Sequence, residues 1–270
     1  MKHIKTFVAL AFLPLILGAC SVKEDRVGCP CTLNVDLDGF ALMGSCREVL
    51  VQVQGKQLLQ RTVNPQDYIG HGYDIEVKRC ANRVSVVSGM KSSVVVGDTL
   101  SVADGVEADP LYLFSSTVLC EDDLAFVEAV PYKKWCDVHI ILENYVPGEE
   151  FPYDVVLSSD CRSVRLSTGE ALPGDYRILV TRTKGGEPVV RLPRQKESVA
   201  ALEFFDRNET RDYSHEKPVF RTDIGLLMDR QGYDWSKDNL DDVYVFVNHA
   251  RMTATIKLVE WEKETLIEEI

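Results

Sequence analysis

The chain has 270 residues, 45% of them hydrophobic, so it has enough apolar side chains for folded domains and is too rich in them for a disordered polymer. Its formal net charge is −12. Such an acidic surface repels phosphate backbones and anionic lipid headgroups, which argues against nucleic acid as a partner.

The N-terminus has the pattern of a bacterial lipoprotein signal. Two lysines precede an apolar run over residues 7–17, which is shorter than the roughly 20 residues that a membrane-spanning helix needs. The run leads into Leu17-Gly18-Ala19-Cys20, which resembles the lipobox at which bacterial lipoproteins are cut and acylated. We therefore expect a signal peptide over residues 1–19 and acyl chains such as palmitate on Cys20. Loss of the signal removes two lysines and no acidic residue, so the net charge changes from −12 to −14.

Residues 20–27 are expected to form a short lipidated tether at the outer membrane. Ser21 stands where some Gram-negative lipoproteins carry the aspartate that retains them in the inner membrane. Lys23-Glu24-Asp25 resembles the charged export signal by which Bacteroidota send lipoproteins to the cell surface, so we expect surface exposure. A solvated tether would also be charged, and an ordinary secretory signal with an accidental cysteine is the alternative for the whole N-terminus.

The cysteines beyond Cys20 are odd in number, so at least one of them is unpaired. In an oxidising cell envelope we expect disulfide bonds among the others, but the sequence leaves their connectivity open. Cys29-Pro30-Cys31 is too tight for a structural zinc site, and its two cysteines are expected to have separate partners. The full set is Cys29, Cys31, Cys46, Cys80, Cys120, Cys136 and Cys161.

Alternating apolar and polar residues predict β-strands along nearly the whole mature chain. Clear examples are residues 33–37, 49–53, 138–142, 243–247 and 252–258. His139 alternates with apolar neighbours, so we expect it to face solvent. Turn signals such as Asp38-Gly39 and Pro173-Gly174 separate the strands, and no helix longer than three turns is expected.

The strand spacing favours β-sandwiches over alternating βαβ units, and the length suits two sandwiches better than one. Val130-Pro131-Tyr132-Lys133-Lys134 interrupts the strand pattern just before a fresh strand begins. We therefore expect an N-terminal sandwich over residues 28–132 and a C-terminal sandwich with a tail over residues 133–270.

Short motifs in a fixed order resemble the FimB-type fimbrial anchor subunits of Bacteroidota. They are Cys-Ser-Val-Lys-Glu-Asp-Arg at 20–26 with Cys29-Pro30-Cys31, Leu-Tyr-Leu-Phe at 111–114, Leu-Pro-Arg-Gln at 192–195, Gly-Tyr-Asp-Trp at 232–235, Leu-Asp-Asp-Val at 240–243, and Trp261. The resemblance covers nearly the whole mature chain. It implies two tandem transthyretin-like β-sandwich domains and a lipoprotein at the base of a type V pilus, which tethers the shaft and influences its length.

The resemblance also implies partners, namely the fimbrial shaft pilin and other minor pilus subunits, joined by strand donation. Main-chain hydrogen bonds hold a donated strand, and alternate side chains fill pockets in the acceptor. The candidate donor residues are Met252, Ala254, Ile256, Leu258, Leu266, Ile267 and Ile270. The alternative is that residues 251–259 form the last strand of the second sandwich and that the tail after them frays.

In shaft subunits of this family a protease removes an N-terminal strand, which opens a groove for the donor. An anchor is expected to keep that strand, because cutting there would separate the lipid from the fold. Residues 33–37 are the expected retained strand. Arg47 is the nearest tryptic-type site after it, and we predict that it stays uncut.

No catalytic, cofactor-binding or metal-binding site is expected. The chain has no nucleophile elbow, Gly-rich phosphate loop or zinc-protease helix, so we expect neither an enzyme nor a cofactor. Acidic residues at 234–242 leave a calcium site as the alternative to a solvated turn.

Asp98-Thr99-Leu100 resembles an O-glycosylation acceptor of Bacteroidota, but whether Thr99 is modified stays open. The alternative function is a surface glycan-binding lipoprotein with Trp135, Trp235 and Trp261 as exposed platforms.

Overall fold

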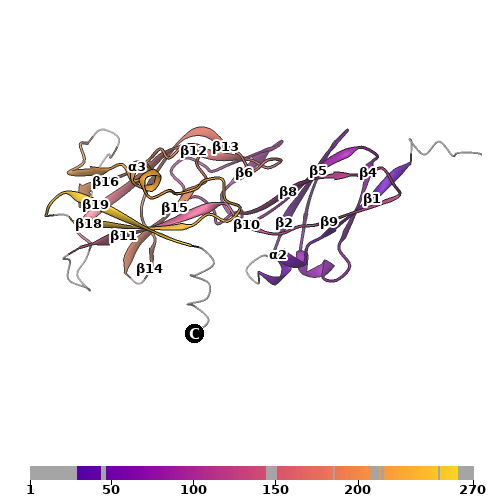
Figure 1. Cartoon of the computed structure of the whole chain (residues 1–270), viewed down its shortest axis with the longest axis horizontal. Coiled ribbons are helices and arrows are strands. Elements are labelled where there is room, and N and C mark those ends of the chain that lie inside the picture. The colour runs from indigo at the N-terminus through magenta and orange to yellow at the C-terminus, as the bar shows by residue number, and fades with distance from the viewer. Residues whose placement is uncertain are drawn as a thin grey trace, which may run out of the picture.

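The computed structural model describes residues 29–43, 47–143, 151–184, 186–207, 213, 216–248 and 250–260. They form two β-sheet lobes arranged end to end (Figure 1), so the expected all-β sandwich fold is confirmed. Cys20, Cys46 and the tail after residue 260 lie outside the described residues. No helix in the described ranges is both long and apolar enough to cross a membrane.

The N-terminal lobe consists of two sheets with the strand orders β4-β1-β9 and β10-β8-β5-β2-β3. A short helix, α2, follows β1, and a 3-10 turn, η2, precedes β4. The bounds are β1 Pro30–Asp36, α2 Asp38–Leu42, β2 Val49–Gln54, β3 Leu58–Val63, η2 Pro65–Tyr68, β4 Tyr73–Lys78, β5 Ala81–Ser88, β8 Tyr112–Leu119, β9 Leu124–Glu128 and β10 Tyr132–Lys133.

The C-terminal lobe also has two sheets, with the orders β14-β15-β11-β18-β19 and β17-β16-β12-β7-β6, and β13 pairs with β12 outside that order. One helix, α3, packs beside β16 and β19. The bounds are β6 Val94–Val96, β7 Thr99–Ser101, β11 Trp135–Leu142, β12 Tyr153–Arg165, β13 Ala171–Leu179, β14 Thr183–Lys184, β15 Glu187–Pro193, β16 Ala200–Asp206, β17 Phe220–Thr222, α3 Ile224–Arg230, β18 Asp242–Asn248 and β19 Thr253–Val259.

The two lobes repeat one arrangement of strands. In each lobe the first strand of its sheet lies between an antiparallel strand and a parallel one. β1 pairs with antiparallel β4 and parallel β9, and β11 pairs with antiparallel β15 and parallel β18. The sequence shows no tandem repeat, so the likeness between the lobes is visible in the strand pairing and not in the sequence.

Side-chain alternation explains which face of each strand lies in a core. In β1 the side chains of Cys31, Leu33 and Val35 are fully buried, whereas those between them are partly exposed. They meet Val51 and Val84 of the facing sheet in one apolar cluster. A separate cluster fills the C-terminal lobe between β11, β18 and the sheet of β12 and β16.

A third apolar cluster joins the lobes. Val87 and Leu113 on the N-terminal side pack with Leu100, Val164 and Leu166, all of them buried. Leu100 belongs to the hairpin β6–β7, which precedes the N-terminal lobe's last strands in sequence but pairs with β12 of the C-terminal lobe. The C-terminal lobe therefore includes residues from before position 132, and the division of the chain into 28–132 and 133–270 stays a prediction.

Most of the expected strands are confirmed, and one expected orientation is wrong. Residues 49–53, 138–142 and 243–247 lie within β2, β11 and β18. His139, expected to face solvent, is only 5% exposed, and its ring stacks on that of Tyr244 at a centroid distance of 4.2 Å. His139 and Tyr244 are register partners on parallel strands, and parallel strands are commonly covered on both faces.

Candidate strand-pairing site and domain join

β1 is an integral strand of the N-terminal sandwich. It has backbone partners on both sides, with β4 from Pro30 to Val35 and with β9 from Thr32 to Asp36. The chain then turns through α2, whose Phe40 is fully buried in the same core as β1. The expected retained strand, residues 33–37, is the second part of β1 plus the buried Leu37. Arg47 is exposed just before β2.

β19 is the last described strand, and it lies at the edge of its sheet. Within the described part of the chain it pairs with β18 alone, so its outer backbone edge faces away from that ladder. Ala254, Ile256 and Leu258 are partly buried and pack against the core of the C-terminal lobe. Met252 lies just before β19, is 48% exposed and has φ of 51°.

The candidate donor residues therefore fall into three groups. Ala254, Ile256 and Leu258 already fill their own sandwich, so β19 offers a partner its backbone edge rather than these side chains. Met252 is not part of the strand. Leu266, Ile267 and Ile270 lie outside the described residues.

Two further edge strands carry exposed apolar side chains, and both were missed from the sequence. β9 exposes 67% of Phe126 and also exposes Leu124, on the edge of the sheet that holds β1. β6 exposes 74% of Val96 together with Val94 at the edge of the opposite lobe's sheet. Exposed apolar edge strands are sites for pairing with another chain. A run such as Val94-Val95-Val96 has no alternation, so the sequence could not assign its faces.

The join between the lobes is held by two consecutive lysines. Lys133, with no solvent exposure, places its Nζ 2.5 Å from Asp242 Oδ1 and 3.2 Å from the carbonyl oxygen of Leu240. Its backbone N–H donates to Asn239 Oδ1 at 2.8 Å. Lys134 donates from Nζ to the carbonyl oxygen of Asp238 at 2.8 Å. Fully buried lysines occur almost only when paired, and here the pairing is local to the join.

Burial sets the protonation of these groups. Loss of solvation raises the pKa of Asp242 to about 7, although the Lys133 ammonium and the N–H of Asp137 favour its charged form. Burial lowers the pKa of the Lys134 ammonium to about 8, with Arg194 nearby acting in the same direction. The join is therefore a place where a change of pH alters charge inside the protein.

The acidic residues at 234–242, for which a calcium site was the alternative, bind side chains and backbone groups of the protein itself. Asp242 pairs with Lys133, Asp241 pairs with Lys237 at 2.6 Å, and Asp234 accepts from Ser236 at the start of the turn. Among the described residues, no three His, Cys, Asp or Glu side chains are arranged to hold a metal ion. Sequence reasoning placed these residues together but assigned them no partner at the join.

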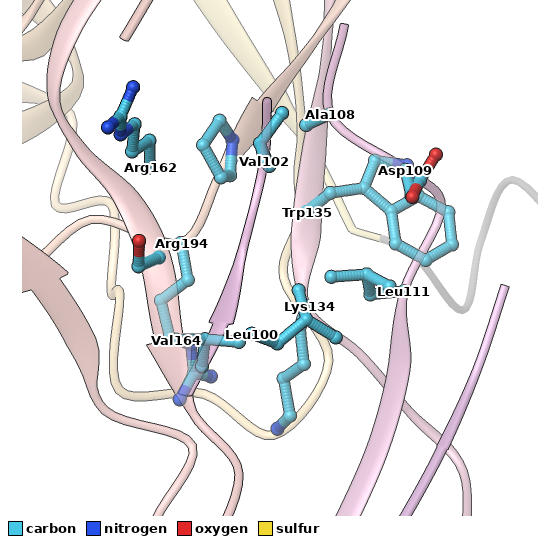
Figure 2. Close-up of a pocket in the computed structure, with 12 residues that line it drawn as sticks. Leu100, Val102, Ala108, Asp109, Leu111, Lys134, Trp135, Arg162, Val164 and Arg194 are labelled. Carbon is cyan, nitrogen blue, oxygen red and sulfur yellow. The ribbon is translucent and has the colours of Figure 1, made fainter. Parts of the chain in front are cut away.

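A small pocket lies at the same join. Figure 2 shows Leu100 between Val164 on one side and Leu111 on the other, with Trp135 beside Leu111. Its volume is about 20 Å³, which is room for roughly one water molecule. The pocket is too small for a sugar or a cofactor.

Two of the three tryptophans proposed as glycan platforms lie in described residues, and both are engaged in packing. Trp135 is 5% exposed, stacks edge-on with Tyr112 and donates from Nε1 to Asp137 at 3.2 Å. Trp235 is partly buried and donates from Nε1 to Ser198 Oγ at 2.9 Å. Trp261 lies outside the described residues.

Solved structures with a similar fold come from Bacteroidota. The fimbrial anchor protein Mfa2 from Porphyromonas gingivalis has 12% identity and a TM-score of 0.57, over 86% of this chain and 98% of that one. A candidate adhesin from Bacteroides ovatus has 11% identity and a TM-score of 0.57, over 86% and 94%. A structure of candidate polysaccharide-binding proteins from Bacteroides thetaiotaomicron has 11% identity and a TM-score of 0.56, over 87% and 99%.

At these identities the likeness shows a shared fold. No protein-family model matches the chain, and no curated protein matches it in sequence. The fold is therefore that of a two-lobed, all-β protein of the kind seen in a fimbrial anchor and in candidate adhesins of Bacteroidota.

Proposed function

We propose that the protein is an outer-membrane lipoprotein that anchors a fimbrium of the type V class and influences its length. Cys20 carries the lipid, and strand pairing with the shaft pilin and other minor subunits holds the fibre. The fold shared with the anchor Mfa2 and the FimB-like motifs along the chain support this role.

The observation that carries the proposal is the place of β1. This strand directly follows the tether from Cys20, and it lies in the middle of its sheet with Leu33 and Val35 fully buried. Cleavage at Arg47 would remove β1 together with α2 and would separate the lipid from both sandwiches. An intact β1 suits a subunit that ends the fibre at the membrane, since its N-terminal sandwich already has the strand that a donor would replace.

Strand pairing gives such an anchor a hold on the shaft. Main-chain hydrogen bonds along an extended segment supply the attachment, and side chains set partner and register. The outer edge of β19 and the residues that follow it in sequence are the proposed points of contact, because β19 is an edge strand of the C-terminal lobe.

The glycan-binding alternative has less support. A structure of similar fold is described as candidate polysaccharide-binding proteins. Sugar-binding platforms need exposed aromatic faces, but Trp135 is buried at the join and Trp235 is packed against Tyr233. The anchor proposal therefore explains more of the chain.

Replacement of the lipidated cysteine tests the role in cells. Cys20→Ala should block lipidation while leaving every described core residue unchanged, so pili should form but detach into the medium. Electron microscopy of the cells and pilin blots of the culture supernatant measure this. Cys29→Ala, an exposed cysteine just after the tether, is the matched control and should keep pili attached. Normal attached pili in the Cys20→Ala strain would contradict the anchor role, and loss of glycan uptake with unchanged fibres would favour the alternative.

A further inference from the structure

Four cysteines gather at the end of the N-terminal lobe where the tether enters. Cys29 and Cys31 begin the lobe, Cys80 lies in the turn between β4 and β5, and Cys120 follows β8. The backbone N–H of Cys120 donates to the carbonyl oxygen of Cys80 at 3.0 Å. The topology thus brings together residues from three separate parts of the sequence.

Two of the four face each other inside the core. Cys31 and Cys120 have no solvent exposure and belong to the same apolar cluster, and the Cys120 thiol is near enough to raise the pKa of Cys31. Cys80 is only partly buried, and its Sγ lies 3.6 Å from the side-chain oxygen Oδ1 of Asn82. Cys29 is exposed.

The backbone around the facing pair is fixed by independent bonds. The N–H of Thr32, next to Cys31, donates to the carbonyl oxygen of Asp123 at 2.9 Å. Arg79 donates from Nε to the carbonyl oxygen of Cys29 at 3.2 Å and from Nη1 to that of Glu121 at 2.8 Å. The start of β1 and the turn after β8 are therefore held side by side without any contribution from sulfur.

We propose that Cys31 and Cys120 form a disulfide bond in the mature protein, which covalently closes the start of β1 onto the turn between β8 and β9. The two thiols lose two protons and two electrons by exchange with a disulfide-bearing oxidase of the cell envelope, whose disulfide is reduced to a dithiol. Cys136 and Cys161, buried in the other lobe, stay as thiols.

The bond should form while the chain folds. Burial raises the pKa of the Cys31 thiol to about 11, so the folded, reduced protein holds almost no thiolate there. Thiolate is the reactive form, and neither sulfur is accessible to an oxidase once the core has closed. Protein that folds in reduced form should therefore stay reduced for a long time under air.

This inference rests on the proposed export to the envelope, and it adds a mechanical consequence. Cys31 is the second residue of β1, so a pull on the tether would reach the disulfide after one strand residue. The disulfide would transmit the pulling force to the turn after β8, so the backbone hydrogen bonds of β1 to β4 and β9 would not break one after another.

The test is a disulfide map of the full-length protein taken from its own cells with free thiols blocked. A tryptic digest without reductant should release the peptide 27–47 linked to the peptide 92–133, with the mass of the two peptides minus two hydrogen atoms plus one blocking group for each remaining free cysteine. The first peptide contains Cys29, Cys31 and Cys46, whereas the second contains Cys120 alone. The link should disappear in Cys31→Ala and persist in the matched controls Cys29→Ala and Cys46→Ala.

Wild-type protein decides the question even if a variant fails to fold. Blocked thiols at both Cys31 and Cys120, or a bond from Cys120 to Cys80 or Cys29, would overturn the inference. Fractionation of the same cells reports location separately. A reduced Cys31–Cys120 pair in protein from the outer membrane would refute the disulfide alone. Protein that remains in the cytoplasm would refute the proposed export.

Discussion

β1 of the N-terminal lobe and β11 of the C-terminal lobe take the same place in their sheets, but the two sheets end differently. Each of the two strands lies between an antiparallel and a parallel neighbour. In the C-terminal lobe the parallel strand β18 is followed by β19, which covers its other side. In the N-terminal lobe the parallel strand β9 is the edge of the described sheet, and it exposes Phe126. The parallel strand therefore has a further neighbour in the C-terminal lobe, whereas in the N-terminal lobe it is an edge strand with an exposed apolar side chain.

The two lobes therefore differ in which strand lies at the edge of the compared sheet. The N-terminal lobe contains the strand that would follow the proposed lipid tether, and this strand pairs with a neighbour on each side. The C-terminal lobe ends in a strand that contributes three side chains to its own core and leaves one backbone edge outward. Lys133 and Lys134 lie between the lobes and bind residues 238–242 of the C-terminal lobe.

The largest expected effect comes from breaking the join. Lys133→Met leaves the Asp242 carboxylate buried without its cation and should lower the free energy of unfolding by about 3–5 kcal/mol at pH 8. Chemical denaturation monitored by tryptophan fluorescence measures this, since Trp135 lies at the join. Lys133→Met with Asp242→Leu should regain most of the loss. A single variant as stable as wild type would show that the pair does not hold the join.

The next effect compares β1 with β11. Leu33→Ala in β1 and Ile140→Ala in β11 each remove a fully buried side chain and should cost roughly 2–5 kcal/mol. Each change should destabilise its own lobe most, because the two residues lie in separate cores. Hydrogen exchange resolved by mass spectrometry locates the loss. Equal loss of protection in both lobes from either change would mean that the lobes unfold as one unit.

A smaller effect is the pH dependence of the join. The pKa of Asp242 is raised to about 7 in the folded protein, above its value in the unfolded chain, so the folded state binds the proton more tightly. The contribution of this group to stability is therefore present at low pH and is lost as pH rises through 7. Asp242→Asn should flatten the stability profile between pH 5 and 8. A wild-type profile that rises with pH across this range, and is unchanged by Asp242→Asn, would contradict the assignment.

The smallest effect on stability should come from the exposed edge. Phe126→Ser removes an exposed side chain and should change the free energy of unfolding by less than about 0.5 kcal/mol. Ile256→Ser on β19 removes a side chain packed against the core and should cost more. Thermal melts of the two variants compare the edges. A larger loss from Phe126→Ser would show that the β9 edge is covered in the intact protein.

The sequence predicted strands where alternation was regular, and it was less informative where contacts come from distant segments. β2, β11 and β18 follow directly from every-second-residue patterns. Alternation does not show whether the polar face of a strand is covered by other parts of the protein, so the exposure of His139 was predicted wrongly. The pair Lys133 and Asp242 joins residues 109 positions apart, and nothing in either local pattern marks a lysine for burial. Edge positions such as Phe126 depend on sheet order, which strand patterns alone do not supply.

The most direct test of the anchor is the N-terminus of the mature protein in its own membrane. Detergent-extracted protein from piliated cells can be measured by intact-mass spectrometry and by mapping of its first peptide. We predict an acylated first residue, Cys20, with β1 and Arg47 present in one continuous chain. A mature protein that begins at Glu48, without β1, would contradict the anchor role and would place the chain among subunits processed for the shaft.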